Sequence, residues 1–221
     1  KAIAGYMRGI IEGAPDLPGV TVGDRRAVHG RHPRGARAGG PGYARRVVTL
    51  DASTPVSPSF AHAVGAAIAS FLAGRRAELA AIGPELHAMT DSAATFTSGG
   101  KRLRPAFCAW GYAGCAQSLD LPPAVLTAAA SLDVLHVSAL IHDDVMDASE
   151  ARRGLPTAHR QFEADARATS GRGDPGAFGR AGAILLGDLL LVWSAELLEN
   201  SGLSPVQLAA VRPWVQAVRT E

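Results

Sequence analysis

Apolar residues recur at intervals of three and four along most of the chain from Ser59 onward. Residues 59–82, SFAHAVGAAIASFLAGRRAELAAI, keep this spacing throughout, which is typical of a helix with one buried face. Gly83-Pro84 interrupts the pattern, and residues 84–96 predict a second, shorter helix. No stretch shows the sustained alternation of apolar and polar residues expected of a half-buried strand, so we predict an all-α fold.

Prolines and glycines divide the rest of the chain into further helices. Pro105 fits the first turn of a helix that follows a loop at residues 98–101. Two prolines open a long helix over about 122–149, which is rich in Ala and Leu and has no glycine or proline in its interior. Further helices are predicted over 156–168, 178–200 and 204–220, with a turn at 151–157 and a loop at 169–177.

The first 57 residues lack this periodicity and are rich in glycine, proline and arginine. Arginine occupies positions 25, 26, 31, 34, 37, 45 and 46. Such a segment buries too little apolar surface to offset the entropy of ordering it. We therefore expect residues 1–57 to be an irregular basic leader, disordered or foreign to the native fold, and residues 58–221 to form the domain. The alternative is a basic arm for RNA or acidic lipid, although only Tyr43 accompanies these arginines as an aromatic.

Composition and charge narrow the class of protein further. A formal charge of +2 is too small to indicate a nucleic-acid partner by itself. Cys108 and Cys115 lie two helical turns apart, too far to bridge each other, which favours a reducing cytoplasm. No uninterrupted apolar run reaches the roughly 18–20 residues of a membrane span, and AILLGDLLLVW is broken by Asp188. We predict a cytoplasmic protein with no membrane span and no nucleic-acid partner.

Three aspartates gather in LIHDDVMDASEARR, near the end of the long predicted helix. Asp143 and Asp147 lie four residues apart and therefore share one helix face, with Asp144 beside them. Negative charge is unfavourable at a helix C-terminus, where the helix dipole is already negative. Hard carboxylate oxygens suit Mg²⁺, which takes its other ligands from water and substrate phosphates. We therefore predict a magnesium site here, and the alternative is a solvated acidic patch.

Basic residues cluster on both sides of these aspartates in the sequence. Lys101, Arg102 and Arg104 lie in GGKRLRP, and two adjacent arginines follow in ARRGLP. Arginine binds phosphate oxygens in pairs and lysine acts as a point charge. His136, two turns before the first aspartate, could donate to a phosphate or be an ordinary core histidine. Together the clusters suggest a diphosphate held through Mg²⁺ on one side and by cations on the other, facing one cavity.

Three linked motifs carry a resemblance to a known family. GGKRLRP at 99–105, LHVSALIHDDVMD at 135–147 and RRGLPT at 152–157 closely resemble the trans-isoprenyl diphosphate (polyprenyl) synthases. The sequence looks most like actinobacterial geranylgeranyl diphosphate synthases over roughly residues 60–221. The resemblance implies an isoprenoid-synthase-type helical bundle that pairs as a homodimer.

The resemblance also implies an activity and one substrate site. The protein would be a prenyltransferase that condenses isopentenyl diphosphate with an allylic prenyl diphosphate and so lengthens it by five carbons. Lys101, Arg104 and His136, with Arg153 beside them, would bind the diphosphate of isopentenyl diphosphate.

The second substrate site would lie at the aspartates. By the resemblance, Asp143 and Asp147 would hold Mg²⁺ on the allylic diphosphate, with Asp144 in the same catalytic motif. Arg152 would contact that diphosphate. The small residues Ser138 and Ala139 would leave room for the growing tail, so we expect a product of C20 or similar length.

One family feature is missing from the sequence. The resemblance implies a second aspartate-rich motif on an opposing helix, and none follows residue 160. We therefore expect the N-terminal part of a synthase, truncated before that motif and with weak or no turnover alone. Three alternatives stay open: a class I terpene cyclase, a non-catalytic partner subunit of a heteromeric prenyl synthase, and a binding protein acting through the basic arm.

Overall fold

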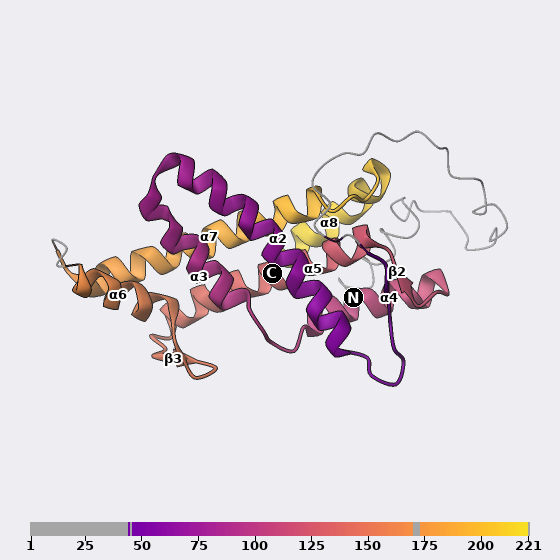
Figure 1. Cartoon of the computed structure of the whole chain (residues 1–221), viewed down its shortest axis with the longest axis horizontal. Coiled ribbons are helices and arrows are strands. Elements are labelled where there is room, and N and C mark those ends of the chain that lie inside the picture. The colour runs from indigo at the N-terminus through magenta and orange to yellow at the C-terminus, as the bar shows by residue number, and fades with distance from the viewer. Residues whose placement is uncertain (1–43, 45, 170–172, 221) are drawn as a thin grey trace.

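A computed structural model describes residues 44, 46–169 and 173–220, and these residues are mainly helical (Figure 1). The α-helices are α2 (Pro58–Ile82), α3 (His87–Thr97), α4 (Leu103–Ala116), α5 (Pro123–Met146), α6 (Ala158–Ala168), α7 (Pro175–Glu199) and α8 (Pro205–Thr220), with a 3₁₀ turn at Pro84–Leu86 before α3. The all-α prediction is confirmed.

Two short antiparallel ribbons accompany the helices. The strands are β1 (Val48–Thr49) with β2 (Asp120–Leu121), and β3 (Ala151–Arg152) with β4 (Leu155–Pro156). In the first ribbon Val48 pairs with Leu121, and the adjoining Leu50 is buried in the core. The folded unit therefore begins before residue 58, although we expected an irregular leader up to residue 57. Most of that leader, residues 1–43 and 45, lies outside the described residues.

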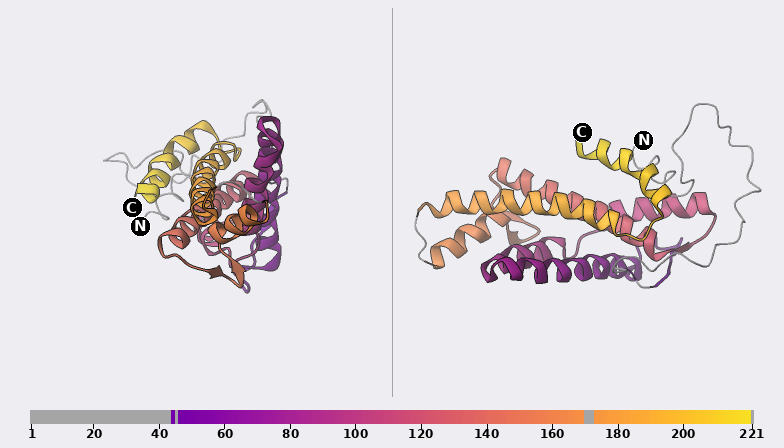
Figure 2. Two further views of the ribbon diagram at one scale, coloured as in Figure 1. Left: turned by 90° about the vertical axis from the view of Figure 1, so that its left-hand side faces the viewer. Right: turned by 90° about the horizontal axis from the view of Figure 1, so that it is seen from above.

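The helices pack around a central pair, α5 and α7. Helices α2 and α4 contact α5, and α6 contacts α7. Figure 2 shows α2 and α3 along one side of this pair and α8 on the other. Helix α5 is apolar around most of its circumference because it is buried on several sides, as expected for a core helix.

Capping residues explain where two of the longer helices begin. The Ser57 hydroxyl accepts a hydrogen bond from the Phe60 backbone N–H at 3.2 Å, and the Asp174 carboxylate accepts two from the first turn of α7. Helix α5 ends at Met146, three residues before the predicted end, because the chain turns into the left-handed region at Ala148, with φ 51°.

Helices α5 and α7 are long and apolar enough by composition to cross a membrane. Packing inside the fold explains much of this apolar composition. In the most apolar 18-residue stretch of each helix, 72% is buried in α5 and 50% in α7. A core helix of a globular protein passes the same test, so the finding is weak evidence for a membrane span. The expectation of no span rests on uninterrupted apolar runs, and Asp188 interrupts the run in α7.

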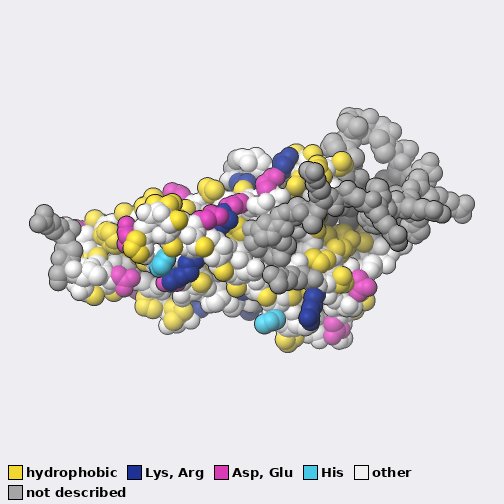
Figure 3. All heavy atoms as spheres, turned by 45° about the horizontal axis from the view of Figure 1, so that its top comes forward, with side chains coloured by type: hydrophobic (Ala, Val, Ile, Leu, Met, Phe, Trp, Pro, Cys, Tyr) yellow, Lys and Arg dark blue, Asp and Glu magenta, His cyan; other side chains and the backbone are white. Residues whose placement is uncertain are grey.

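Part of α7 faces outward. Phe178, Ile184, Leu185 and Val192 are exposed along it. On the face of the molecule in Figure 3, apolar side chains are interspersed with isolated acidic and basic ones. That face therefore carries no broad area of one charge among the described residues.

Candidate functional site

The GGKRLRP segment forms the loop between α3 and α4 and the start of α4. Gly99 and Gly100 have φ of 70° and 89°, and Arg102 has φ of 47°. Glycine adopts these left-handed conformations at little cost, whereas for arginine the cost is roughly 1–2 kcal/mol. Contacts elsewhere in the fold must therefore hold the backbone at Arg102 in this conformation.

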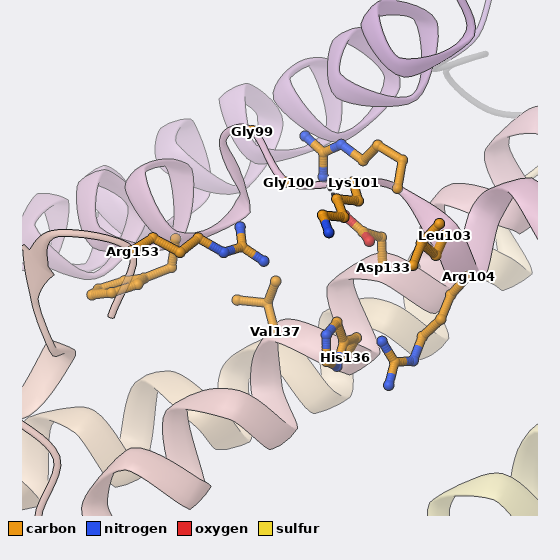
Figure 4. A pocket seen from close by; sticks show the side chains of 11 residues that line it. Gly99, Gly100, Lys101, Leu103, Arg104, Asp133, His136, Val137 and Arg153 are labelled. Carbon is orange, nitrogen blue, oxygen red and sulfur yellow. Dashed lines mark hydrogen bonds and ion pairs between the residues drawn. The ribbon is translucent and has the colours of Figure 1, made fainter. Parts of the chain in front are cut away.

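A cavity of about 440 Å³ opens beside this loop. We call it the cation pocket, and it is lined by Phe96, Gly99, Gly100, Lys101, Arg102, Leu103, Arg104, Asp133, His136, Val137 and Arg153. Figure 4 shows Arg153 entering from one side and Lys101 from the other, above Val137 and His136 of α5. The structure thus brings together all four residues expected at the isopentenyl diphosphate site.

Burial and nearby positive charge both lower the pKa of His136. Burial lowers the pKa of His136 below its usual 6.5, and the positive charge of Arg104 lowers it further. Asp133, one helical turn away, partly offsets these effects. At neutral pH His136 is therefore mainly neutral and can gain a proton as the pH falls.

A buried ion pair under the pocket was not foreseen. Arg102 and Asp133 are 6% and 8% exposed and pair with each other. The second guanidinium nitrogen of Arg102 donates to the backbone carbonyl of Thr97 at 2.8 Å. These residues lie 31 positions apart, and nothing in the local sequence distinguished Arg102 from the neighbouring cations that line the pocket with exposed side chains.

The three aspartates lie at the end of α5 and differ in burial. Asp143 and Asp147 are exposed, whereas Asp144 is 2% exposed. Arg152 binds Asp144 with two hydrogen bonds of 2.7 and 2.8 Å and reaches Asp143 at 3.5 Å. The hydrogen bond from Arg152 to Asp144 raises the pKa of the guanidinium above its usual value. Asp144 is thus occupied by an internal partner, and Asp143 and Asp147 present their carboxylates outward.

The β3–β4 hairpin places the two adjacent arginines. Arg153 and Gly154 form its two-residue turn with φ of 53° and 80°, the signs that a type I′ turn requires. Arg152 extends to the aspartates, and Arg153 lies against Gly100 in the cation pocket. One hairpin therefore supplies a cation to each of the two clusters.

The cation pocket does not include the three aspartates at the end of α5, although we expected both clusters to face a common space. They are instead neighbours along α5, because His136 and Asp143 lie seven residues apart on one helix face. That spacing corresponds to about 10 Å along the helix axis.

The donor set at the aspartates fits Mg²⁺ but not a cage made of protein ligands alone. Within the described ranges, no three His, Cys, Asp or Glu side chains converge as metal ligands. Magnesium commonly uses one or two carboxylates and completes its shell with water and substrate phosphates. The exposed carboxylates of Asp143 and Asp147 satisfy that requirement.

The two residues expected to affect chain length face different ways. Ala139 is exposed, one turn before Asp143 on the same face. Ser138 is buried, and its hydroxyl donates to the backbone carbonyl of Gly187 on α7 at 2.7 Å. Ala139 therefore lies on the open face beside the aspartates, and Ser138 lies at the contact between α5 and α7. The effect of either residue on chain length stays a prediction.

Comparisons with known proteins agree with this architecture. The sequence model of the polyprenyl synthetase family matches residues 86–216. Geranylgeranyl pyrophosphate synthase from Corynebacterium glutamicum, solved as a complex with isoprenyl diphosphate and magnesium, has a TM-score of 0.68 and 39% identity, covering 77% of this chain and 48% of that one.

Two curated relatives match over shorter segments. Geranylgeranyl diphosphate synthase of Methanosarcina mazei is 35% identical over 111 residues, which are 50% of this chain and 28% of the relative. Nonaprenyl diphosphate synthase of Mycobacterium tuberculosis is 35% identical over 117 residues, 52% of this chain and 29% of the relative. The match thus spans under a third of each curated relative. Because the family's sequence model covers more than half of this chain, the chain belongs to the polyprenyl synthetase family.

Proposed function

We propose that the protein is a trans-prenyltransferase that joins isopentenyl diphosphate to an allylic prenyl diphosphate. The observation that carries the proposal is the cation pocket, in which Lys101, Arg104, His136 and Arg153 surround one cavity next to exposed aspartates on α5. A pocket of this charge fits a diphosphate, because arginine and lysine bind phosphate oxygens directly. The folded unit from β1 onward would form the part of a synthase domain that holds both diphosphates.

Each cluster has a distinct task in the proposed reaction. Lys101 and Arg104 hold the diphosphate of isopentenyl diphosphate, and His136 donates a hydrogen bond to it. Asp143 and Asp147 would hold Mg²⁺, which neutralises charge on the allylic diphosphate as it departs. Arg152 lies close enough to Asp143 to contact the same diphosphate.

The proposed condensation requires no reactant besides the two diphosphates. The carbon–oxygen bond to the allylic diphosphate breaks, and pyrophosphate leaves with the bonding electrons. The isopentenyl double bond attacks the resulting allylic cation, and loss of one proton yields an allylic diphosphate five carbons longer. Stabilising the departing negative charge is the part that these side chains supply.

The proposal extends to the length of the product, the oligomeric state and the choice between synthase and cyclase. The relatives named geranylgeranyl diphosphate synthase support a C20 product, and the small exposed Ala139 leaves space beyond the aspartates. We propose a homodimer in the cytoplasm. A terpene cyclase uses one diphosphate only, so the separate cation pocket favours the two-substrate synthase.

Binding and turnover together test the proposed function. We expect isopentenyl diphosphate to bind the chain in calorimetry, and Lys101→Ala to weaken binding about 10- to 100-fold, since a charged hydrogen bond contributes roughly 1.5–3 kcal/mol. Arg76→Ala is the matched control, because Arg76 pairs with Asp91 and neither residue lines the pocket. Product formation is measured with labelled isopentenyl diphosphate, farnesyl diphosphate and Mg²⁺.

The outcomes separate the candidate functions. No binding of isopentenyl diphosphate, or binding that Lys101→Ala leaves unchanged, would contradict a synthase. Ionisation of the allylic diphosphate alone would indicate a cyclase. Binding without turnover, together with co-purification of a complete synthase and a changed product length, would indicate the partner subunit.

A further inference from the structure

Arg102 belongs to the GGKRLRP motif but does not share the exposure of its neighbours. Lys101 and Arg104 are exposed, whereas Arg102 turns inward and pairs with Asp133. Its backbone adopts the left-handed conformation at the start of α4. Arg102 also lines the cation pocket, but its guanidinium is engaged by Asp133 and by the carbonyl of Thr97. We therefore expect its task to differ from direct binding of the ligand.

The guanidinium of Arg102 lies where three helices meet. It donates to the carbonyl of Thr97, the last residue of α3. The carbonyls of a helix's last turn have no hydrogen-bond partner within that helix. Arg102 also pairs with Asp133 on α5 and approaches Gly65 on α2, where an added Cβ would lie 3.5 Å from a guanidinium nitrogen. Arg102 thereby fixes the loop at residues 99–101 to the helices around the pocket.

The partner on α5 links this anchor to the pocket. Asp133 lies three residues before His136, so the two side chains leave neighbouring positions on one helix face. Holding Arg102 against Asp133 therefore sets the distance of the loop from His136. Because buried ion pairs contribute little net stability compared with apolar pairs, the geometry that this pair enforces is its distinctive contribution.

We propose that Arg102, held by Asp133, is a positioning residue that keeps Lys101 and Arg104 directed at the same diphosphate as His136. This inference rests on the proposed function for the identity of the ligand. Arginine is required because one planar group bonds to a carboxylate and a carbonyl at once, which the single ammonium of lysine does in a less fixed geometry.

The test compares loop order with ligand binding in the same variants. The double variant Arg102→Met with Asp133→Leu removes both charges together, so that neither is left buried alone. Arg102→Lys keeps the charge, and Arg76→Met, which breaks the exposed pair with Asp91, is the matched control. Hydrogen exchange of the amides at 99–104 is measured without ligand, and calorimetry gives the affinity for isopentenyl diphosphate.

We expect the double variant to melt cooperatively, to exchange the 99–104 amides faster, and to bind isopentenyl diphosphate about 10- to 100-fold more weakly, as displaced binding groups do. Arg102→Lys should recover part of the affinity, and Mg²⁺-dependent binding of an allylic diphosphate analogue should be unchanged. A loop that stays protected, or one that loosens without loss of affinity, would overturn the proposal. If the unaltered protein fails to bind isopentenyl diphosphate, the proposed function fails, and the exchange measurement still decides whether Arg102 anchors the loop.

Discussion

Adjacent residues of like chemistry serve different purposes in this fold. Arg152 and Arg153 reach separate clusters, and Asp143 is exposed whereas the adjacent Asp144 is buried. The sequence predicts which residue types belong near a diphosphate. It does not predict which of two neighbours turns inward, because that depends on backbone dihedral angles set by tertiary contacts.

The protonation of His136 predicts a pH dependence of binding. Burial and Arg104 lower the pKa of free His136 below 6.5, and a bound diphosphate anion would raise it again. Protons and ligand then promote each other's binding, so the affinity for isopentenyl diphosphate should increase as the pH falls from 8 toward and below 6.5. Calorimetry across this range measures the slope.

The ligand also titrates, so a control is needed for this slope. His136→Gln retains a hydrogen-bond donor but has no charge change, and it should show a shallower dependence than the unaltered protein. Identical slopes for the two proteins would show that His136 does not face the ligand.

The sequence pattern predicts which segments are helical better than it predicts where each helix ends. The predicted helix at 59–82 matches α2, and a loop does precede Pro105 in α4. The two-residue strands could not be predicted, because an alternation of apolar and polar residues is recognisable only over several residues. The end of α5 was placed three residues late, since Ala148 is a poor signal for a left-handed helix stop.

Close approach of α6 and α7 makes a second prediction possible. A Cβ added at Gly179 would overlap the carbonyl oxygen of His159 and lie 2.9 Å from the Cβ of Glu163. Gly179→Ala should therefore separate the helices and destabilise the fold by about 1–3 kcal/mol, the usual cost of overpacking. Thermal and urea unfolding measure the change.

Gly114 in α4 provides the matched control for this substitution. Nothing lies within 4 Å of a Cβ added there, so Gly114→Ala should be neutral or stabilise the protein by up to about 1 kcal/mol through helix propensity. Equal effects of the two substitutions would show that the contact between α6 and α7 is not tight at Gly179.

At the scale of the described fold, two clusters lie along one central helix, and the cation pocket is lined by members of one of them. The motifs predicted the members of each cluster, and four of the residues expected at one site do line one cavity. The separation of the clusters could not be predicted, because it depends on how the hairpin and the α3–α4 loop pack on α5.

This arrangement predicts that the two sites respond to different substitutions. Asp143→Asn should abolish most Mg²⁺-dependent binding of an allylic diphosphate analogue, since it removes one of the two exposed carboxylates that we propose as Mg²⁺ ligands. Its effect on isopentenyl diphosphate binding should be less than about threefold, because screening weakens charge effects over about 10 Å. Titration of each ligand against the unaltered protein and the variant measures both effects, and an equal loss at both sites would mean that they form one site.

The short hairpin limits how either site can evolve. Because Arg152 and Arg153 are consecutive and a two-residue turn fixes the direction of each side chain, one inserted or deleted residue would redirect both arginines at once. Loop length, which proteins commonly vary to retune a binding site, is therefore constrained here. Either cluster can then change more readily by exchange of its side chains than by a change in the length of this hairpin.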